Sequence, residues 1–167
     1  MRIQGFGTRG AGFSRPSNPD PHSFSMTRVD FYSNAEPKLQ VACQLVSKAT
    51  RQQLRVVVYA PDENTARGFD KLLWTYQAIG FAPHCMAHHA LASETPVVIA
   101  RGDAEMPHYQ VILNLHADSP PSFGRFERLI ELVGAGDDDR RLARGRYRFY
   151  RDRGYEIRHH DLSRSGV

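Results

Sequence analysis

A short and almost continuous run of apolar, mostly β-branched residues, RVVVYA at positions 55–60, constrains the fold more than any other feature of the sequence. Apolar side chains at consecutive positions of a strand point to both faces of a sheet, so such a strand is expected to be covered on both sides. Further β-rich runs alternate with helical patterns, at 27–32, 85–87, 96–100, 110–115 and 155–162. This order predicts an α/β fold, a three-layer α/β/α sandwich around a mostly parallel central sheet.

Four segments carry apolar residues at the three- to four-residue spacing of a helix. They are 36–52, the residues after Asp62, 123–133 and 137–153. Asp62 can cap the second helix and Ser122 the third, in which Phe126, Leu129, Ile130 and Val133 are expected to turn inward. The fourth helix has three aspartates at its start and arginines toward its end, which suits the helix dipole, and Gly154 is expected to end it.

Length and composition predict one domain with an extension. Residues 1–25 are rich in glycine and proline and have no apolar period, so we expect a disordered extension that an upstream start codon or a non-native addition would explain. The single α/β domain is predicted over 26–162, with a frayed C-terminus at 163–167. No apolar run approaches the roughly 18 residues of a membrane helix, and Cys43 and Cys85 are too few for a disulfide framework. A cytoplasmic protein that contacts no membrane is therefore expected.

Nucleotide-binding motifs do not occur in a usable context. The segment 5–10 (GFGTRG) matches G-x-G-x-x-G, but it lies in the expected disordered extension, without the strand and helix that the motif needs. The first predicted strand is followed by SNAEPK at 33–38, which has no glycine to open a phosphate-binding loop. Nucleoside triphosphate chemistry is therefore not expected.

Metal and catalytic motifs are also weak. The cluster His84, Cys85, His88 and His89 has no second cysteine nearby, so solvated histidines are favoured over a zinc site. The sequence has no G-x-S-x-G nucleophile elbow, and Asp30, inside the first predicted strand, is better explained as a sheet partner than as a base. We expect no catalytic residues, no metal and no cofactor.

Two patterns have no such simple explanation. Seven arginines fall between Arg140 and Arg153, opposed only by Asp152, and Arg140, Arg144, Tyr147 and Arg151 share one helical face. Such a face can bind an acidic peptide or a nucleic-acid backbone, or it can be a merely solvated surface.

The second pattern is aromatic. Leu72 and Leu73 suffice for the core face of their helix, so Trp74 and Phe81 either form an exposed apolar patch or pack in the core. Exposed aromatic patches of this kind are typical of protein interfaces.

Four motifs in order make the sequence resemble the chi subunit family of DNA polymerase III, a clamp-loader accessory subunit of the bacterial replisome. The resemblance runs from about Thr27 to Tyr155. Its motifs are the opening strand TRVDFY, Phe69-Asp70-x-x-Leu73-Trp74, Phe81-x-Pro83-His84 and Leu142-Ala143-Arg144-x-Arg146-Tyr147. The family has a three-layer α/β fold that looks like a nucleotide-binding sheet without a phosphate loop.

The resemblance implies a non-catalytic adaptor with two binding faces, working in the cytoplasm at the replication fork. The face matching Trp74 and Phe81 would bind the psi subunit, and through it the clamp-loader complex; in some bacteria a helicase-like repair protein shares this face. The other face would bind the acidic, Phe-ending C-terminal tail of single-stranded DNA-binding protein. Its residues match Val133, Arg140, Arg144, Tyr147 and Arg148. Contact with nucleic acid would then be mainly indirect.

Two other functions stay open on the residues alone. The arginine-rich helix could bind nucleic acid directly, although base-stacking aromatic residues are not interleaved on a sheet face in any evident pattern. A nucleotide-handling enzyme on the parallel sheet is the third reading, and the missing phosphate loop weighs against it.

Overall fold

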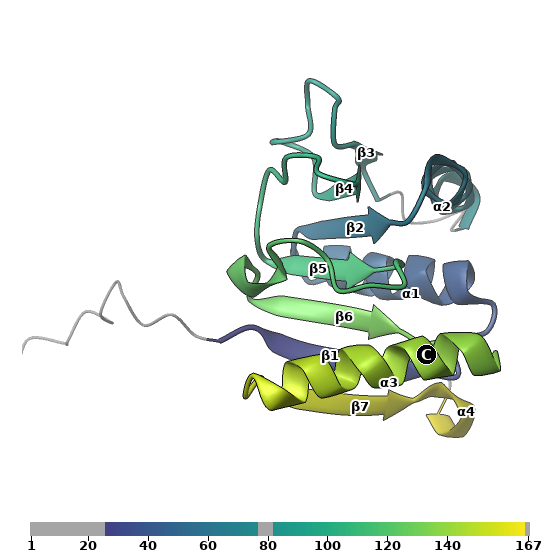
Figure 1. Ribbon diagram of the computed structural model, residues 1–167. Helices are drawn as coiled ribbons and strands as arrows, with labels where there is room; N and C mark the ends of the chain where they lie inside the picture. Colours follow the sequence, from purple (N-terminus) through teal and green to yellow (C-terminus); the bar gives the residue numbers. More distant parts are fainter. Residues whose placement is uncertain (1–25, 77–81, 166–167) are drawn as a thin grey trace, which may run out of the picture.

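The computed structural model describes residues 26–76 and 82–165 of the chain. Within these residues seven strands form one sheet in the order β3-β4-β2-β5-β6-β1-β7, and every neighbouring pair is parallel (Figure 1). The strands are β1 (Arg28–Ser33), β2 (Val56–Ala60), β3 (His84–Met86), β4 (Val97–Arg101), β5 (Val111–Asn114), β6 (Arg128–Leu132) and β7 (Ile157–Asp161). The helices are α1 (Lys38–Arg51), α2 (Glu63–Tyr76), α3 (Asp137–Asp152) and the one-turn α4 (Leu162–Ser165). The predicted extension 1–25 and the predicted interface residue Phe81 lie outside the described residues.

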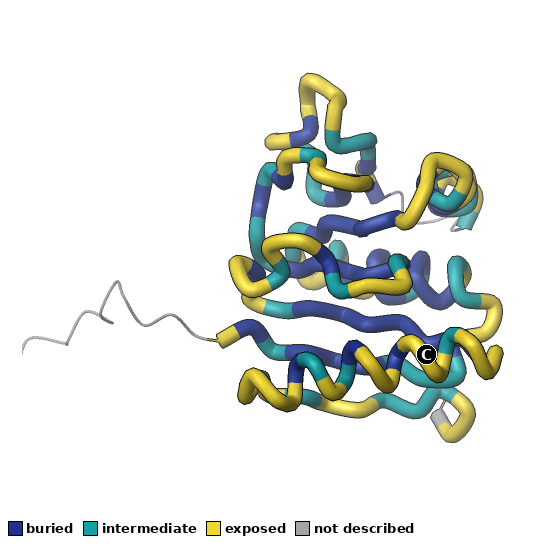
Figure 2. The backbone as a smooth tube through the Cα atoms, viewed as in Figure 1, coloured by how far each residue is buried: buried dark blue, intermediate teal, exposed yellow. Residues whose placement is uncertain are grey.

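The predicted α/β sandwich is confirmed. All five residues of β2 are buried, as the apolar run predicts, and β2 pairs with β4 and β5 inside the sheet. Helices α1 and α2 pack on one face of the sheet and α3 on the other, so the buried residues form one core on each face (Figure 2). None of the helices among the described residues is long and apolar enough to cross a membrane.

The predicted ends of two helices are also confirmed. Asp62 Oδ1 accepts a hydrogen bond from the Thr65 N–H at 2.7 Å, the contact expected of a residue that caps α2. Gly154 follows the end of α3 with φ +80°, a left-handed conformation that costs glycine little and other residues more.

The predicted helix over 123–133 is wrong. Residues Phe123–Arg125 form only a single 3₁₀ turn, Ser122 makes no side-chain cap, and Arg128–Leu132 is the interior strand β6. A strand covered on both faces carries apolar residues at consecutive positions, so a short apolar run fits helical spacing equally well. Leu129 does turn toward the α3 side, whereas Ile130 and Leu132 turn toward α1 and α2.

The edge strand β7 is tied to the sheet through a buried carboxylate. Asp30, in β1, is 1% exposed, with Arg128 Nε at 2.6 Å, Arg28 Nε at 3.1 Å and His160 Nε2 at 2.8 Å. Burial alone would raise the pKa of Asp30, but the contacts with His160 and Arg128 hold it below its usual value. Asp30 is therefore a structural sheet partner, as the sequence suggested.

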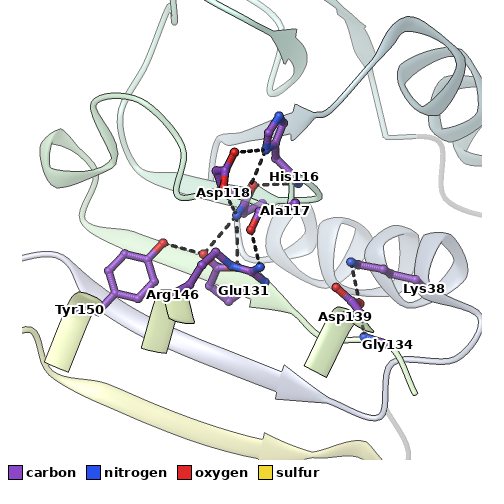
Figure 3. Close-up of polar contacts among 10 residues, drawn as sticks. Lys38, His116, Ala117, Asp118, Glu131, Gly134, Asp139, Arg146 and Tyr150 are labelled. Carbon is purple, nitrogen blue, oxygen red and sulfur yellow. Dashed lines mark hydrogen bonds and ion pairs between the residues drawn. The ribbon is translucent and has the colours of Figure 1, made fainter. Parts of the chain in front are cut away.

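Helix α3 is anchored to the sheet by a buried polar network (Figure 3). Arg146 Nε donates to Glu131 Oε2 at 2.9 Å, and the Tyr150 hydroxyl donates to Glu131 Oε1 at 2.6 Å. Arg146 also reaches the Ala117 carbonyl at 2.7 Å, and Asn114 Nδ2 lies 3.1 Å from Glu131 Oε1. Burial raises the pKa of the Glu131 carboxyl, and the donors around it act in the opposite direction.

The first turn of α3 has a second anchor. Asp139 Oδ2 accepts hydrogen bonds from the Gly134 N–H at 2.6 Å and from Lys38 Nζ at 3.0 Å (Figure 3). A Cβ on Gly134 would lie 3.0 Å from that carboxylate oxygen, so the close approach favours glycine. The two anchors fix both the position of α3 and its rotation about its own axis.

Arg146→Ala should lower the free energy of unfolding by about 3–5 kcal/mol, because it leaves the Glu131 carboxylate buried without a cationic partner. The double substitution Glu131→Gln with Arg146→Met should recover much of that loss, since the glutamine side-chain oxygen can still accept a hydrogen bond from the Tyr150 hydroxyl. Chemical denaturation measures both, with Arg148→Ala on the exposed side of the same helix as control. A loss below about 1 kcal/mol for Arg146→Ala would contradict this role.

Acid should destabilise the fold partly through His108. This histidine is 6% exposed, and burial together with the nearby charge of Arg55 lowers the pKa of its imidazole to about 4. In the unfolded chain the group binds its proton near pH 6.5, so between about pH 6.5 and 4 the unfolded state holds more protons. The free energy of unfolding should fall over that window as pH falls, by at most about 3 kcal/mol.

Urea titrations at pH 7, 5.5 and 4 measure this contribution by comparison with His108→Phe, which removes the titrating group. The difference in unfolding free energy between the two proteins should shift in favour of the variant as pH falls. Parallel pH profiles would show that His108 is not the acid-sensitive group.

Candidate functional site

A groove of about 480 Å³ lies along the inner side of α3, between that helix and strands β1 and β7. Its volume lies in the range typical of small-ligand pockets and is ample for one aromatic side chain. The residues that line it come from β1, α3 and β7 and from the segments that follow β1 and β6: Phe31, Ser33, Asn34, Val133, Arg140, Ala143, Arg144, Tyr147 and His159.

The topology of the sheet explains this location. The chain leaves the end of β1 for α1 on one face, and it leaves the end of the neighbouring strand β6 for α3 on the opposite face (Figure 1). Two adjacent parallel strands whose connections diverge leave a crevice at their carboxyl ends, where open α/β sheets usually bind ligands. Asn34 follows β1 and Val133 follows β6, so the groove occupies this switch point.

Apolar and aromatic groups form the floor and walls of the groove. Phe31, Val133 and Ala143 are buried and belong to the core on the α3 side of the sheet. The Tyr147 ring packs edge-on against Phe31 with centroids 5.7 Å apart, and the His159 ring lies 5.2 Å from that of Tyr147. These contacts hold both rings as rigid walls that can contact an apolar side chain.

Two arginines stand at the rim of the groove, and they differ in their partners. Arg140 Nη2 donates to the side-chain oxygen Oδ1 of Asn34 at 3.2 Å, and Arg140 Nη1 lies 3.8 Å from Asp137 Oδ1. Arg144 is exposed, and among the residues that the structure describes none forms an ion pair with it. A guanidinium without a carboxylate partner beside an apolar groove is suited to bind an external anion with two hydrogen bonds.

The structure brings four of the five predicted tail-binding residues together. Val133, Arg140, Arg144 and Tyr147 all line the groove. Arg148 is exposed and lies outside its lining, and within the described part of the chain it has no ion-pair partner. Whether these residues bind the predicted tail stays a prediction.

Sequence reasoning missed five residues of the groove: Phe31, Ser33, Asn34, Ala143 and His159. The rule that ligands bind at the carboxyl ends of diverging strands could have found Ser33 and Asn34. It cannot be applied to the sequence alone, because the pattern at 123–133 predicts a helix and so does not indicate that β6 is a strand beside β1. His159 carries no such signal, since its position depends on the pairing of β7 with β1.

The arrangement is poorly suited to phosphate. A phosphate at a switch point usually binds free backbone N–H groups at a glycine-rich turn before a helix. Here the Asp139 carboxylate already accepts from the Gly134 N–H, and two more aspartates begin α3. These negative charges disfavour a nucleotide at this position.

The Trp74 region is separate from the groove. Trp74 is 56% exposed near the end of α2, with its ring 4.8 Å from the ring of His84 in β3. His84 Nδ1 lies 2.7 Å from the Ala82 carbonyl oxygen, which holds the imidazole beneath the indole. Of the predicted partner interface, only Trp74 can be assessed, because Phe81 lies outside the described residues.

A second hollow of about 480 Å³ lies between the start of α2 and the ends of β3 and β4. Its lining carries charges of both signs, including the ion pair of Arg67 with Glu63 and the residues Arg101 and Asp103. Mixed and partly paired charges do not select a ligand, so we assign the site to the α3 groove. No group of three or more potential metal ligands gathers within residues 26–76 and 82–165.

Comparison with known proteins identifies relatives over nearly the whole described chain. The model of the family "DNA polymerase III chi subunit, HolC" matches residues 26–158. The DNA polymerase III subunit chi of Pseudomonas aeruginosa is 38% identical over 143 residues, which cover 83% of this chain and 99% of the relative. The subunit chi of Escherichia coli is 28% identical over 132 residues, 78% of this chain and 88% of the relative.

Solved structures of low sequence identity share the fold. The C-terminal domain of Saccharomyces cerevisiae Dbp5 superimposes with a TM-score of 0.58 at 11% identity, over 82% of this chain and 90% of that one. The Escherichia coli DEAD-box protein SrmB has a TM-score of 0.54 at 14% identity, over 81% of this chain and 91% of that one. Likeness at this level supports the α/β fold and nothing about activity.

Proposed function

This chain belongs to the DNA polymerase III chi subunit family, and from that premise we propose that it is a non-catalytic adaptor of the replisome. It joins the acidic tail of single-stranded DNA-binding protein to the clamp loader, the latter through the psi subunit, in the cytoplasm at the replication fork. The observation that carries the proposal is the Arg144 guanidinium beside the apolar groove of α3, which has no ion-pair partner among the described residues.

The chemistry of the groove fits a peptide that ends in phenylalanine. The terminal side chain can pack against the wall formed by Tyr147 and His159 and reach the apolar floor at Val133. The terminal carboxylate is then close to the rim, where Arg144 can donate two parallel hydrogen bonds and Arg140 adds a second positive charge. Only a C-terminal residue presents a side chain and a carboxylate from the same backbone position, which makes the groove selective for a chain end.

The face around Trp74 is proposed as the site of the psi-type partner. A large aromatic side chain that is 56% exposed has apolar area available for burial, and its packing on His84 fixes its orientation before binding. A preorganised aromatic residue loses little side-chain entropy on binding, which is why tryptophan is frequent among residues that dominate interfaces. Trp74 packs beside β3 and the groove lies beside β7, the strands at opposite edges of the sheet, so both partners can bind at once.

Direct nucleic-acid binding is a second candidate, favoured by the exposed Arg144 and Arg148, neither of which forms an ion pair within residues 26–76 and 82–165. The aromatic residues of α3 do not form a stacking surface for successive bases. Tyr150 is buried, Tyr147 is packed edge-on against Phe31 in the wall of the groove, and Arg153 covers the Phe149 ring. Titration with single-stranded DNA at several salt concentrations separates the two functions. Phosphate binding predicts a log–log salt slope of about 0.7 per phosphate contact, whereas an adaptor should bind the strand weakly or not at all.

A peptide ending in Asp-Asp-Ile-Pro-Phe should bind the protein at roughly micromolar affinity, a binding free energy of about 8 kcal/mol. Arg144→Ala should weaken this binding by about 1.5–3 kcal/mol, the usual contribution of a hydrogen bond to a charged group. Amidation of the peptide C-terminus should have a similar effect. The substitution and the amidation together should weaken binding little more than either alone, because both remove the same contact between Arg144 and the terminal carboxylate. Isothermal titration calorimetry measures all four affinities.

Arg141→Ala provides the matched control, because Arg141 is an exposed arginine of the same helix that pairs with Asp138. The Arg141→Ala substitution should weaken peptide binding by well under 1 kcal/mol. If the amidated peptide binds as tightly as the free acid, the groove does not recognise a chain end and the proposal is wrong.

Trp74→Ala should change the free energy of unfolding by no more than about 1 kcal/mol, since more than half of the side chain is exposed. It should weaken binding of the psi subunit by at least about 2 kcal/mol and leave the binding of the tail peptide unchanged. Leu91→Ala is the control, because Leu91 is 54% exposed on the segment between β3 and β4. Undiminished psi binding by the Trp74 variant would exclude this face as the interface.

A further inference from the structure

The side of the sheet opposite α3 is polar at its β7 end. Side chains two positions apart lie on the same face of a strand, so Arg28, Asp30 and Tyr32 of β1 share one face. Tyr32 packs against the core under α1 and α2, which places all three on that side. Figure 1 shows α1 behind β5, whereas β7, among the described residues, has on this side only the one-turn α4 at its end. The polar face is therefore accessible to a ligand.

A hollow of about 140 Å³ lies where this face meets the second half of α1. The residues that line it are Tyr32, Leu45, Lys48, Ala49, Gln52, Arg128 and Ile130. A water molecule occupies about 30 Å³ in the liquid, so the hollow has room for about four or five waters or for one compact anion. It is separated from the α3 groove by the thickness of the sheet.

The polar groups of the hollow have hydrogen-bond donors to spare. Arg128 Nε donates to Asp30 Oδ2 at 2.6 Å, and Arg128 Nη2 donates to the Tyr32 hydroxyl at 3.1 Å. These bonds fix the guanidinium and use two of its five N–H groups, so three remain for a ligand within the described part of the chain. Because the Tyr32 hydroxyl accepts a bond from Arg128, its own proton is available to donate.

The charge around the hollow is positive. Arg28 and Arg128 share the single carboxylate of Asp30, at 3.1 and 2.6 Å. Lys48 is exposed and forms no ion pair with any residue in 26–76 or 82–165. Three cations thus face one carboxylate, which leaves an excess of two positive charges. The lining itself contains no carboxylate, unlike the hollow at the start of α2, where charges of both signs are mixed.

We propose that this hollow is an anion site that binds a phosphate group. A phosphate monoester carries a charge of about −1.5 to −2 at neutral pH, which matches the excess positive charge. Its three free oxygens accept hydrogen bonds in different directions. That suits donors from three separate elements, Lys48 of α1, Tyr32 of β1 and Arg128 of β6. A carboxylate, with two oxygens in one plane, would engage fewer of them.

The group that carries the phosphate would lie outside the hollow, beside His160. The His160 ring stacks on the Tyr32 ring with centroids 4.3 Å apart, and its Nε2 lies 2.8 Å from Asp30 Oδ1. These contacts hold the imidazole in place, while 38% of its side chain stays exposed. A nucleoside monophosphate can therefore stack its base on this ring, whereas inorganic phosphate fills only the hollow.

Titration of the ¹⁵N-labelled full chain with inorganic phosphate, at an ionic strength held constant with chloride, locates the site. The backbone amide signals of residues 48–53 and 128–130 should shift and reach saturation in the millimolar range. Methyl phosphate and a deoxynucleoside monophosphate should shift the same signals. Tighter binding of the nucleotide would assign the site to nucleotides, and equal affinities would assign it to the phosphate group alone.

Substitutions test which side chains hold the anion. Lys48→Met should weaken phosphate binding by at least about fivefold and Tyr32→Phe by about threefold, because each removes a donor to a charged acceptor. Lys71→Met is the matched control, since Lys71 is an exposed lysine of α2 far from the hollow lining, and it should leave the affinity unchanged.

Three results would overturn the inference. They are shifts that do not saturate, shifts that gather on residues 140–151 of α3 instead, and equal phosphate affinities of the Lys48→Met and Lys71→Met proteins. None of these results bears on the proposed function, because the α3 groove lies on the other face of the sheet. Conversely, failure of the tail peptide to bind would leave the phosphate site standing.

Discussion

The position of α3 depends on the buried contact between Glu131 and Arg146. Glu131 sits inside the interior strand β6 with no exposed surface, and its carboxylate is surrounded by donors from Arg146, Tyr150 and Asn114. Since residues two positions apart lie on nearly opposite sides of a helix, an inward Arg146 forces Arg144 and Arg148 outward. One buried arginine thereby decides which other arginines are available to a partner.

The same anchoring shapes the groove. Asp139 holds the start of α3 against Gly134 and Lys38, and the network at Glu131 holds its middle, so Tyr147 is pressed against Phe31. The last wall comes from β7, which the contact of His160 with Asp30 ties to β1 and which presents His159 to the groove. The site is thus built on rigid elements, which favours recognition of a small number of side chains with defined geometry.

The crevice of this fold differs in chemistry from the phosphate sites of nucleotide-binding sheets. The crevice at the carboxyl ends of β1 and β6 is where a nucleotide-binding sheet holds phosphate. In this chain the first turn of α3 carries three aspartates, and one of them already binds the Gly134 N–H. Positive charge comes instead from side chains along the helix, which suits an extended anionic peptide better than a compact phosphate.

The sequence by itself determined most of the strands, the helices α1, α2 and α3, the cap at Asp62, the end of α3 at Gly154 and the shared helical face of Arg140, Arg144 and Tyr147. These depend on interactions between residues close in the chain, which local patterns record. The sequence did not distinguish β6 from a helix, because a strand buried on both faces has no period of two. Only the tertiary structure decided that Arg146 turns inward to Glu131 and that Asn34 and His159 join the groove, because those contacts connect residues far apart in the chain.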